Sequence, residues 1–134
     1  MVTAEITAKN YFGARHGLET LFQAMEYDDL PGGGFLMLAD LTISDGPAYR
    51  HRGVMVDTAR CFIEEDVLKG IIDGMASSKL NVFHWHFADS QSFPVELSTA
   101  PVDQMLQYGA YGRNSVYSVD TVKSLVDYAA YRGF

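Results

Sequence analysis

The chain has 134 residues, a common size for a single domain that buries a hydrophobic core. Its 17 acidic and 10 basic residues give a formal net charge of −7, which argues against nucleic-acid binding because such proteins carry clustered basic residues. No apolar run approaches the roughly 20 residues of a membrane span, and the single cysteine, Cys61, excludes an internal disulfide. We therefore expect an ordinary globular protein with a neutral or modestly charged ligand.

The first third of the chain predicts a strand, a helix and a second strand. Residues 2–8 alternate apolar and polar side chains, as a half-buried strand does. Residues 13–29 predict a helix with an apolar stripe, which consists of Leu18, Leu21, Phe22 and Met25. Pro31 and the glycines at 32–34 predict a turn, and residues 35–43 predict the second strand.

From residue 49 onward the pattern becomes strand, helix, strand, helix. Residues 52–57 are short, apolar and β-branched, which is typical of a strand covered on both faces. A helix is predicted from Glu64, with an acidic first turn that suits the macrodipole. Its expected buried stripe is Val67, Leu68, Ile71, Ile72 and Met75. Residues 79–89 predict a second buried strand, followed by a long connection.

A second helix is predicted after this connection. Ser118 is placed to cap it, and its apolar face is expected to be Val122, Leu125, Val126 and Ala129. Gly133 is expected to end the helix, and Phe134 to begin a third strand.

This order predicts an α/β fold of parallel βα units, with right-handed crossovers that leave the helices outside the sheet. The pattern fits a doubly wound sheet or a (β/α)₈ barrel. The absence of a glycine-rich phosphate loop after residues 52–57 favours the barrel. Both architectures bind ligands at the carboxyl ends of their strands, so residues 57–60 and 86–90 are the expected site.

Arg60 and Asp89 are the candidate functional residues at these two strand ends. The guanidinium of Arg60 suits adjacent hydroxyls or a carboxylate, and a salt bridge to Asp57 or Asp89 is an equal alternative. The Asp89 carboxylate can orient a catalytic partner or, alternatively, cap the turn at residues 89–92.

His84 and His86 share one face of the second strand. Together with Asp89 they could serve a metal-dependent hydrolase, but a zinc site needs a more complete set of ligands. His84 also lies well inside an apolar strand, where a neutral, hydrogen-bonded core histidine is the commoner outcome. We therefore predict neither a metal site nor a cofactor.

Three segments closely resemble the β-N-acetylhexosaminidases of glycoside hydrolase family 20, the animal enzymes most of all. They are HRGVMVDTAR, IIDGMASSKLNVFHWHFADSQSFP and YGAYGRNSVYS. The upstream ITAKNYFGARHGLETLFQAM resembles the end of the small α/β domain that precedes the barrel in this family. The resemblance implies that residues 1–46 are the C-terminal part of that domain plus a linker. Residues 47–134 would be the first two βα units of the catalytic (β/α)₈ TIM barrel.

The resemblance implies a retaining exo-β-N-acetylhexosaminidase that removes terminal β-linked N-acetylglucosamine or N-acetylgalactosamine from glycans or chitooligosaccharides. In this family the acetamido oxygen of the substrate is the nucleophile, and an Asp-Glu pair after the fourth strand orients the acetamide and acts as general acid/base. By match to the motifs, Arg60 would bind hydroxyls of the terminal sugar. Asp89, supported by His86, would hold a histidine that supports the catalytic glutamate.

The sequence departs from the family pattern because it contains no Asp-Glu dipeptide and stops before the motifs of the third and fourth strands. We therefore expect a fragment with no catalytic residue, inactive by itself and prone to aggregate through open strand edges. The alternative is a carbohydrate-binding remnant without catalysis. The resemblance further implies a lysosomal or extracellular parent of the secretory pathway that can form a homodimer, although residues 1–13 show no signal-peptide pattern.

Overall fold

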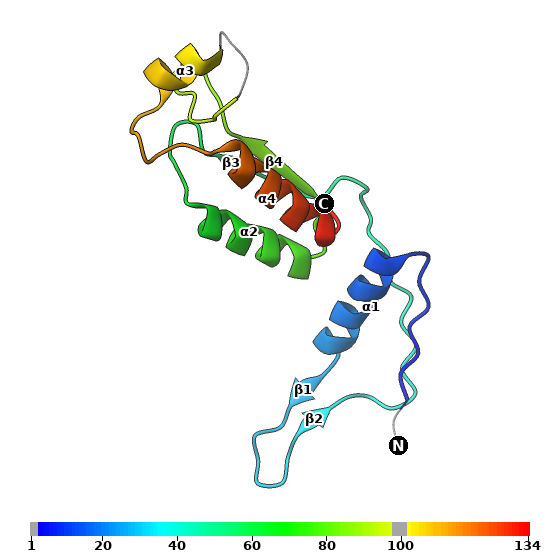
Figure 1. Ribbon diagram of the computed structural model, residues 1–134. Helices are drawn as coiled ribbons and strands as arrows, with labels where there is room; N and C mark the ends of the chain where they lie inside the picture. The colour runs from blue at the N-terminus through cyan, green and yellow to red at the C-terminus, as the bar shows by residue number, and fades with distance from the viewer. Residues whose placement is uncertain (1–2, 98–101) are drawn as a thin grey trace. The chain divides into compact units, whose positions relative to one another are not determined.

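The computed structural model describes residues 3–97 and 102–134 and divides into two compact units, Met1–Arg50 and His51–Phe134. The first unit contains α1 (Tyr11–Gln23) and a small hairpin made of β1 (Glu26–Tyr27) and β2 (Phe35–Leu36) (Figure 1).

The predicted helix is confirmed over most of its length, but α1 ends at Gln23, and Glu26 and Tyr27 of the predicted range form β1 instead. Local signals rather than burial account for the start of α1. The side chain of Asn10 caps it by accepting a hydrogen bond of 2.8 Å from the amide of Gly13. No residue of α1 is buried, and Leu18 and Phe22 of the predicted stripe are 59% and 64% exposed. The apolar stripe of α1 is therefore only partly covered within this unit, since Leu21 and Met25 are half-buried.

The hairpin confirms the predicted turn but not the predicted strand lengths. The amide of Asp28 donates to the carbonyl of Gly34 at 2.9 Å, and β1 and β2 pair antiparallel. The predicted strand at 35–43 shortens to β2, because β1 supplies only two residues for pairing, and Asp40, with a φ of 56°, lies in a turn that follows. The predicted strand at 2–8 is wrong for its described residues, since alternation alone gives them no ladder to join.

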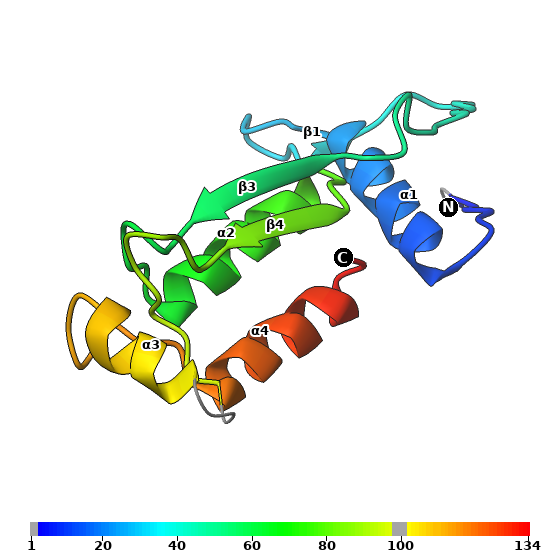
Figure 2. The same ribbon diagram turned by 90° about the horizontal axis from the view of Figure 1, so that it is seen from above.

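The second unit confirms the predicted order of strand, helix, strand and helix. Its elements are β3 (Gly53–Asp57), α2 (Glu65–Ser77), β4 (Val82–His86), α3 (Val102–Gly109) and α4 (Val119–Tyr131). The strands are parallel, and α2 and α4 lie side by side on one face of the pair (Figures 1 and 2). Helix α3 lies within the long connection, where the sequence did not predict a helix. The described part of this unit is therefore α/β with a parallel strand pair.

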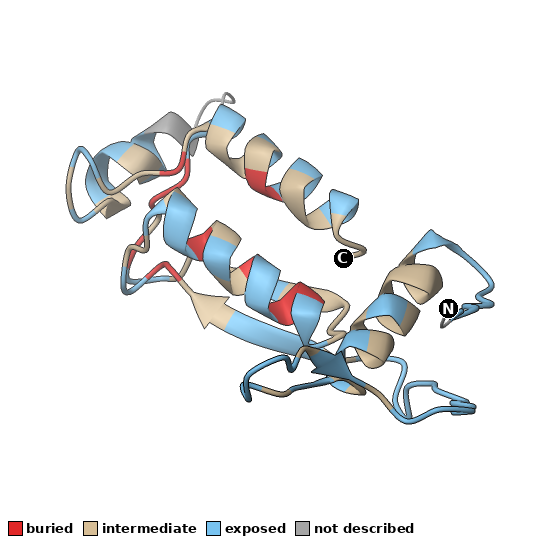
Figure 3. Cartoon of the chain, turned by 90° about the horizontal axis from the view of Figure 1, so that it is seen from below, coloured by how far each residue is buried: buried red, intermediate tan, exposed pale blue. Residues whose placement is uncertain are grey.

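The core of the second unit lies between the strand pair and the two helices. Its fully buried members are Leu68, Ile72, Val95, Tyr117 and Leu125, each at most 2% exposed. Figure 3 shows the buried residues along α2, α4 and the segments that connect the elements. Most of the stripe predicted for α2 is confirmed. Val67 of α2 and Val126 of α4 are the corrections, since they lie at the margins of their stripes and are 55% and 57% exposed.

The ends of α4 follow the predicted signals. Ser118 caps the helix, its Oγ accepting a hydrogen bond of 3.0 Å from the amide of Thr121. Gly133 has a φ of 93° just beyond the C-cap, the left-handed conformation that glycine adopts readily. Phe134 was predicted to begin a third strand, but its amide donates to the carbonyl of Ala129 at 3.1 Å, so it belongs to the helix end.

The other face of the strand pair corrects two predictions of burial. Met55 pairs in register with His84, so both side chains lie on the same face. Met55 is 56% exposed and His84 is also exposed, whereas the sequence predicted strands covered on both faces and a buried His84. The reason is that both packed helices cover the opposite face, and no described element of this unit covers this one.

None of the helices in the described part of the chain is long and apolar enough to cross a membrane.

Candidate functional site

The carboxyl ends of β3 and β4 lie next to each other and are fixed by two further contacts. The amide of Thr58 donates to the carbonyl of His86 at 2.9 Å, which extends the ladder one residue beyond β3. The indole Nε1 of Trp85 donates to Thr58 Oγ1 at 2.8 Å, and Thr58 is fully buried. The residues that follow each strand are therefore held in a defined spatial relation.

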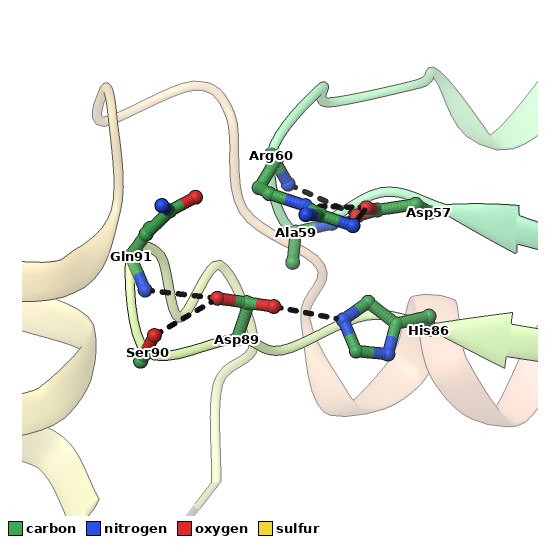
Figure 4. A network of polar contacts seen from close by, with 7 residues as sticks. All are labelled: Asp57, Ala59, Arg60, His86, Asp89, Ser90 and Gln91. Carbon is green, nitrogen blue, oxygen red and sulfur yellow. Dashed lines mark hydrogen bonds and ion pairs between the residues drawn. The ribbon is translucent and has the colours of Figure 1, made fainter.

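Arg60 follows β3 and is held by Asp57, the last residue of that strand. Its Nε donates to Asp57 Oδ2 at 2.6 Å, and its Nη2 forms an ion pair with the same oxygen (Figure 4). The other carboxylate oxygen, Oδ1, accepts the backbone amides of Ala59 at 3.0 Å and Arg60 at 3.2 Å. Of the two alternatives left open for Arg60, the salt bridge is present, and the partner is Asp57.

Asp89 follows β4 and divides its two oxygens between a histidine and a turn. Oδ2 lies 3.2 Å from Nε2 of His86 (Figure 4). Oδ1 accepts the Ser90 hydroxyl at 3.1 Å and the Gln91 amide at 3.2 Å. Of the two roles weighed for Asp89, the turn cap is present, and the other oxygen contacts His86. The orientation of a catalytic partner by Asp89 stays a prediction.

Charge in the site follows these contacts. Hydrogen bonding from the backbone and side chain of Arg60 lowers the pKa of Asp57, and the Asp57 carboxylate raises the pKa of Arg60. The pKa of Asp89 is lowered, first by the Gln91 amide, then by His86 and Ser90, with a further contribution from the charge of Arg60. The site therefore contains two ionised carboxylates and a permanent cation at neutral pH.

A metal centre finds little support in this geometry. His86 and Asp89 are in contact, but among residues 3–97 and 102–134 no three His, Cys, Asp or Glu side chains cluster so as to hold a metal ion. The metal-dependent hydrolase that would use His84, His86 and Asp89 has no ligand set in the described residues.

Tyr117 braces the segment that links Arg60 to α2, a role that the sequence did not predict. Its hydroxyl donates to the carbonyl of Ile63 at 2.6 Å and accepts the amide of the same residue at 3.1 Å. The ring stacks on Phe62 at 4.7 Å, and burial raises the pKa of the phenol. Such a link between residues 54 positions apart leaves no local signal in the sequence.

Arg60, His86 and Asp89 are suited to binding and orienting a ligand, but they are not a complete set of catalytic groups. Arg60 is half-exposed, with 52% of its side chain open to solvent, so it can donate to an oxygen-rich ligand. Asp89 and His86 can orient a neighbouring polar group. The geometry thus brings the three predicted site residues to one edge of the strand pair.

Comparison with known proteins shows the family of the segment that contains these strand ends. Residues 49–134 match the family model for the catalytic domain of glycosyl hydrolase family 20. A chitooligosaccharidolytic β-N-acetylglucosaminidase of Bombyx mori is 45% identical over 132 residues, which are 98% of this chain and 22% of the relative. A β-hexosaminidase subunit B2 of Dictyostelium discoideum is 40% identical over 93% of this chain and 22% of its own.

Solved structures agree with the sequence relatives. A family 20 chitobiase of Flavobacterium johnsoniae matches with a TM-score of 0.77 and 35% identity, over 91% of this chain and 17% of that protein. An exo-β-N-acetylglucosaminidase of Vibrio harveyi, solved in complex with N-acetylglucosamine, matches with a TM-score of 0.67 and 27% identity, over 91% and 21%. The chain spans about a fifth of the length of the curated relatives. It belongs to glycosyl hydrolase family 20.

Proposed function

We propose that this chain is part of a retaining exo-β-N-acetylhexosaminidase that hydrolyses terminal β-linked N-acetylglucosamine or N-acetylgalactosamine. The observation that carries the proposal is the family match over residues 49–134, which includes both strand ends with Arg60 and Asp89. Relatives named for chitooligosaccharides and a neighbour that binds N-acetylglucosamine support an amino-sugar substrate. Chitooligosaccharides and glycoconjugate glycans both present such a terminal sugar.

The proposed architecture is a (β/α)₈ barrel in which β3–α2 and β4–α4 are the first two units. The parallel strand pair with helices on one face supports this assignment, because barrel helices cover only the outer face of the sheet. Residues 1–46 would be the end of the small α/β domain that precedes the barrel. The proposed location of the full-length protein, by analogy with the family, is the secretory pathway, in the lysosome or outside the cell.

In this proposal the residues of the chain bind and orient, and the acid/base chemistry belongs to an Asp-Glu pair outside it. Arg60 donates hydrogen bonds to hydroxyls of the terminal sugar. Asp89, held by His86 at 3.2 Å, orients a histidine that supports the general acid/base. The exposed guanidinium and the position of both residues at the carboxyl ends of adjacent strands support these roles.

The test is hydrolysis of an aryl N-acetyl-β-glucosaminide by the full-length protein that carries this chain. We expect release of the aryl group, and a fall of kcat/KM by at least about tenfold in Arg60→Ala, since a charge-assisted hydrogen bond contributes about 1.5–3 kcal/mol.

Lys123→Ala is the matched control, because it removes an exposed positive charge from α4 and should leave kcat/KM unchanged. A full-length protein that is folded yet inert on this substrate would contradict the proposed activity. Equal rates for Arg60→Ala and the unchanged protein would contradict the role of Arg60 alone.

A further inference from the structure

Of the two carboxylates at the strand ends, Asp57 makes more contacts than Asp89, and its two oxygens accept from different groups. Oδ1 accepts the two backbone amides of Ala59 and Arg60, which shapes the turn after β3. Oδ2 accepts from the guanidinium of Arg60, through Nε at 2.6 Å and through Nη2. One carboxylate therefore sets both the backbone and the side-chain direction of the same arginine.

The contact with Oδ2 fixes which edge of the guanidinium stays available. A guanidinium has five N–H donors in a rigid plane, and two of them face Asp57. Both hydrogens of Nη1 and one of Nη2 remain. Because the plane is rigid, holding one edge aims the other, and the 52% exposure of the Arg60 side chain leaves that edge open to a ligand.

The geometry points to Asp57 as a positioning residue that aims Arg60 at the hydroxyls of the terminal sugar. This inference rests on the proposed function and adds to it the group that orders the binding arginine before substrate arrives. Without Asp57, the long side chain of Arg60 would lose rotamer freedom only on binding, at a cost of about 0.5–1.5 kcal/mol. Asp57 touches Arg60 and not the sugar, so it acts through the arginine.

Asp57→Asn separates the two functions of the carboxylate. The amide of asparagine has the same shape but only one oxygen, so it can accept either from the two backbone amides or from the guanidinium. Its NH₂ group then faces the remaining N–H donors, with which it cannot form a hydrogen bond. In the full-length protein we expect KM for the aryl N-acetyl-β-glucosaminide to rise by about twofold to tenfold, which corresponds to the cost of ordering Arg60 on binding, with kcat within about threefold. The inhibition constant of free N-acetylglucosamine should rise in parallel.

The deciding measurement is a double-mutant cycle with Arg60→Ala. If Asp57 acts through Arg60, Asp57→Asn should change KM by less than about twofold once the arginine is gone. A purely structural role would give the same change of KM in both backgrounds, and that result overturns the inference. The conservative variant Asp57→Glu, which keeps the charge but moves it by one methylene, should restore part of the affinity only when Arg60 is present. The same cycle run with Asp57→Glu keeps the inference testable if Asp57→Asn does not fold.

Asp66→Asn on α2 is the control for the change of charge, since Asp66 is exposed and KM should not respond. Two failures remain distinguishable. Loss of all hydrolysis in the unchanged protein contradicts the proposed function. Normal hydrolysis with a raised KM in Arg60→Ala but an unchanged KM in both Asp57 variants overturns only the role of Asp57.

Discussion

Helices α1 and α2 have the same length, 13 residues, yet they differ completely in burial. Helix α1 buries no residue, whereas α2 buries Leu68, Ile72, Met75 and Ala76. Both have an apolar stripe, and α1 has the better N-cap, because Glu64 makes no side-chain capping bond. A stripe therefore predicts that a helix forms, but its burial depends on which strands and helices the same unit provides.

The largest expected difference comes from truncating the same residue type in each helix. Leu68→Ala should lower the free energy of unfolding by about 2–5 kcal/mol, because Leu68 is fully buried and its loss leaves a cavity. Leu18→Ala, at a position 59% exposed, should change it by less than about 0.5 kcal/mol. Urea unfolding of this chain followed by circular dichroism measures both. Equal costs would show that α1 is covered in solution.

A smaller effect is expected at the brace between Tyr117 and Ile63. Tyr117→Phe keeps the ring in the core but leaves the amide and carbonyl of Ile63 without their partner, which should cost about 1–3 kcal/mol. Tyr108→Phe is the control, since Tyr108 is 81% exposed. Indistinguishable melting temperatures for the two variants would argue against the brace.

The smallest effect is expected at the polar contacts between α2 and α4. Asp73 accepts the Tyr128 hydroxyl at 2.8 Å and pairs with Arg132, but half of its side chain is exposed, so the ion pair contributes about 0–1 kcal/mol. The Tyr128 hydroxyl, and then Arg132, lower the pKa of Asp73. The contribution is therefore complete above the unfolded pKa of 3.8 and is lost as the pH falls through the folded pKa.

This pH dependence can be isolated with one substitution. Between pH 7 and pH 3 the melting temperature should fall further for the unchanged chain than for Asp73→Asn, which has no charge to lose. Parallel curves for the two proteins would contradict the contribution of Asp73.

Sequence predicted the second unit better than the first for a physical reason. The stripes of α2 and α4 and the Ser118 cap are local signals, and the parallel order followed from alternation of strands and helices. The strand predicted at 2–8 and the long strand at 35–43 failed because pairing needs a partner that alternation does not reveal. Helix α3 was missed in a connection rich in turn-forming residues.

The candidate site was predictable in position but not in its contacts. Strand ends located Arg60 and Asp89, since parallel neighbours end at one edge of a sheet. The sequence could not choose between a free Arg60 and one held by Asp57, because spacing of three residues permits both. Exposure of His84 depended on which face of the pair the helices cover, which is a property of tertiary structure.

The bond from Trp85 to Thr58 gives the chain a built-in optical label. Trp85 is its single tryptophan, its Nε1 donates across the strand pair, and its ring meets Tyr117 edge-on at 5.0 Å. Fluorescence excited selectively at tryptophan therefore follows the joining of β3 to β4 and the arrival of Tyr117 on the core. The first unit has no tryptophan and does not contribute to this emission. One emission spectrum can thus monitor the second unit, which contains the candidate site, separately from the first.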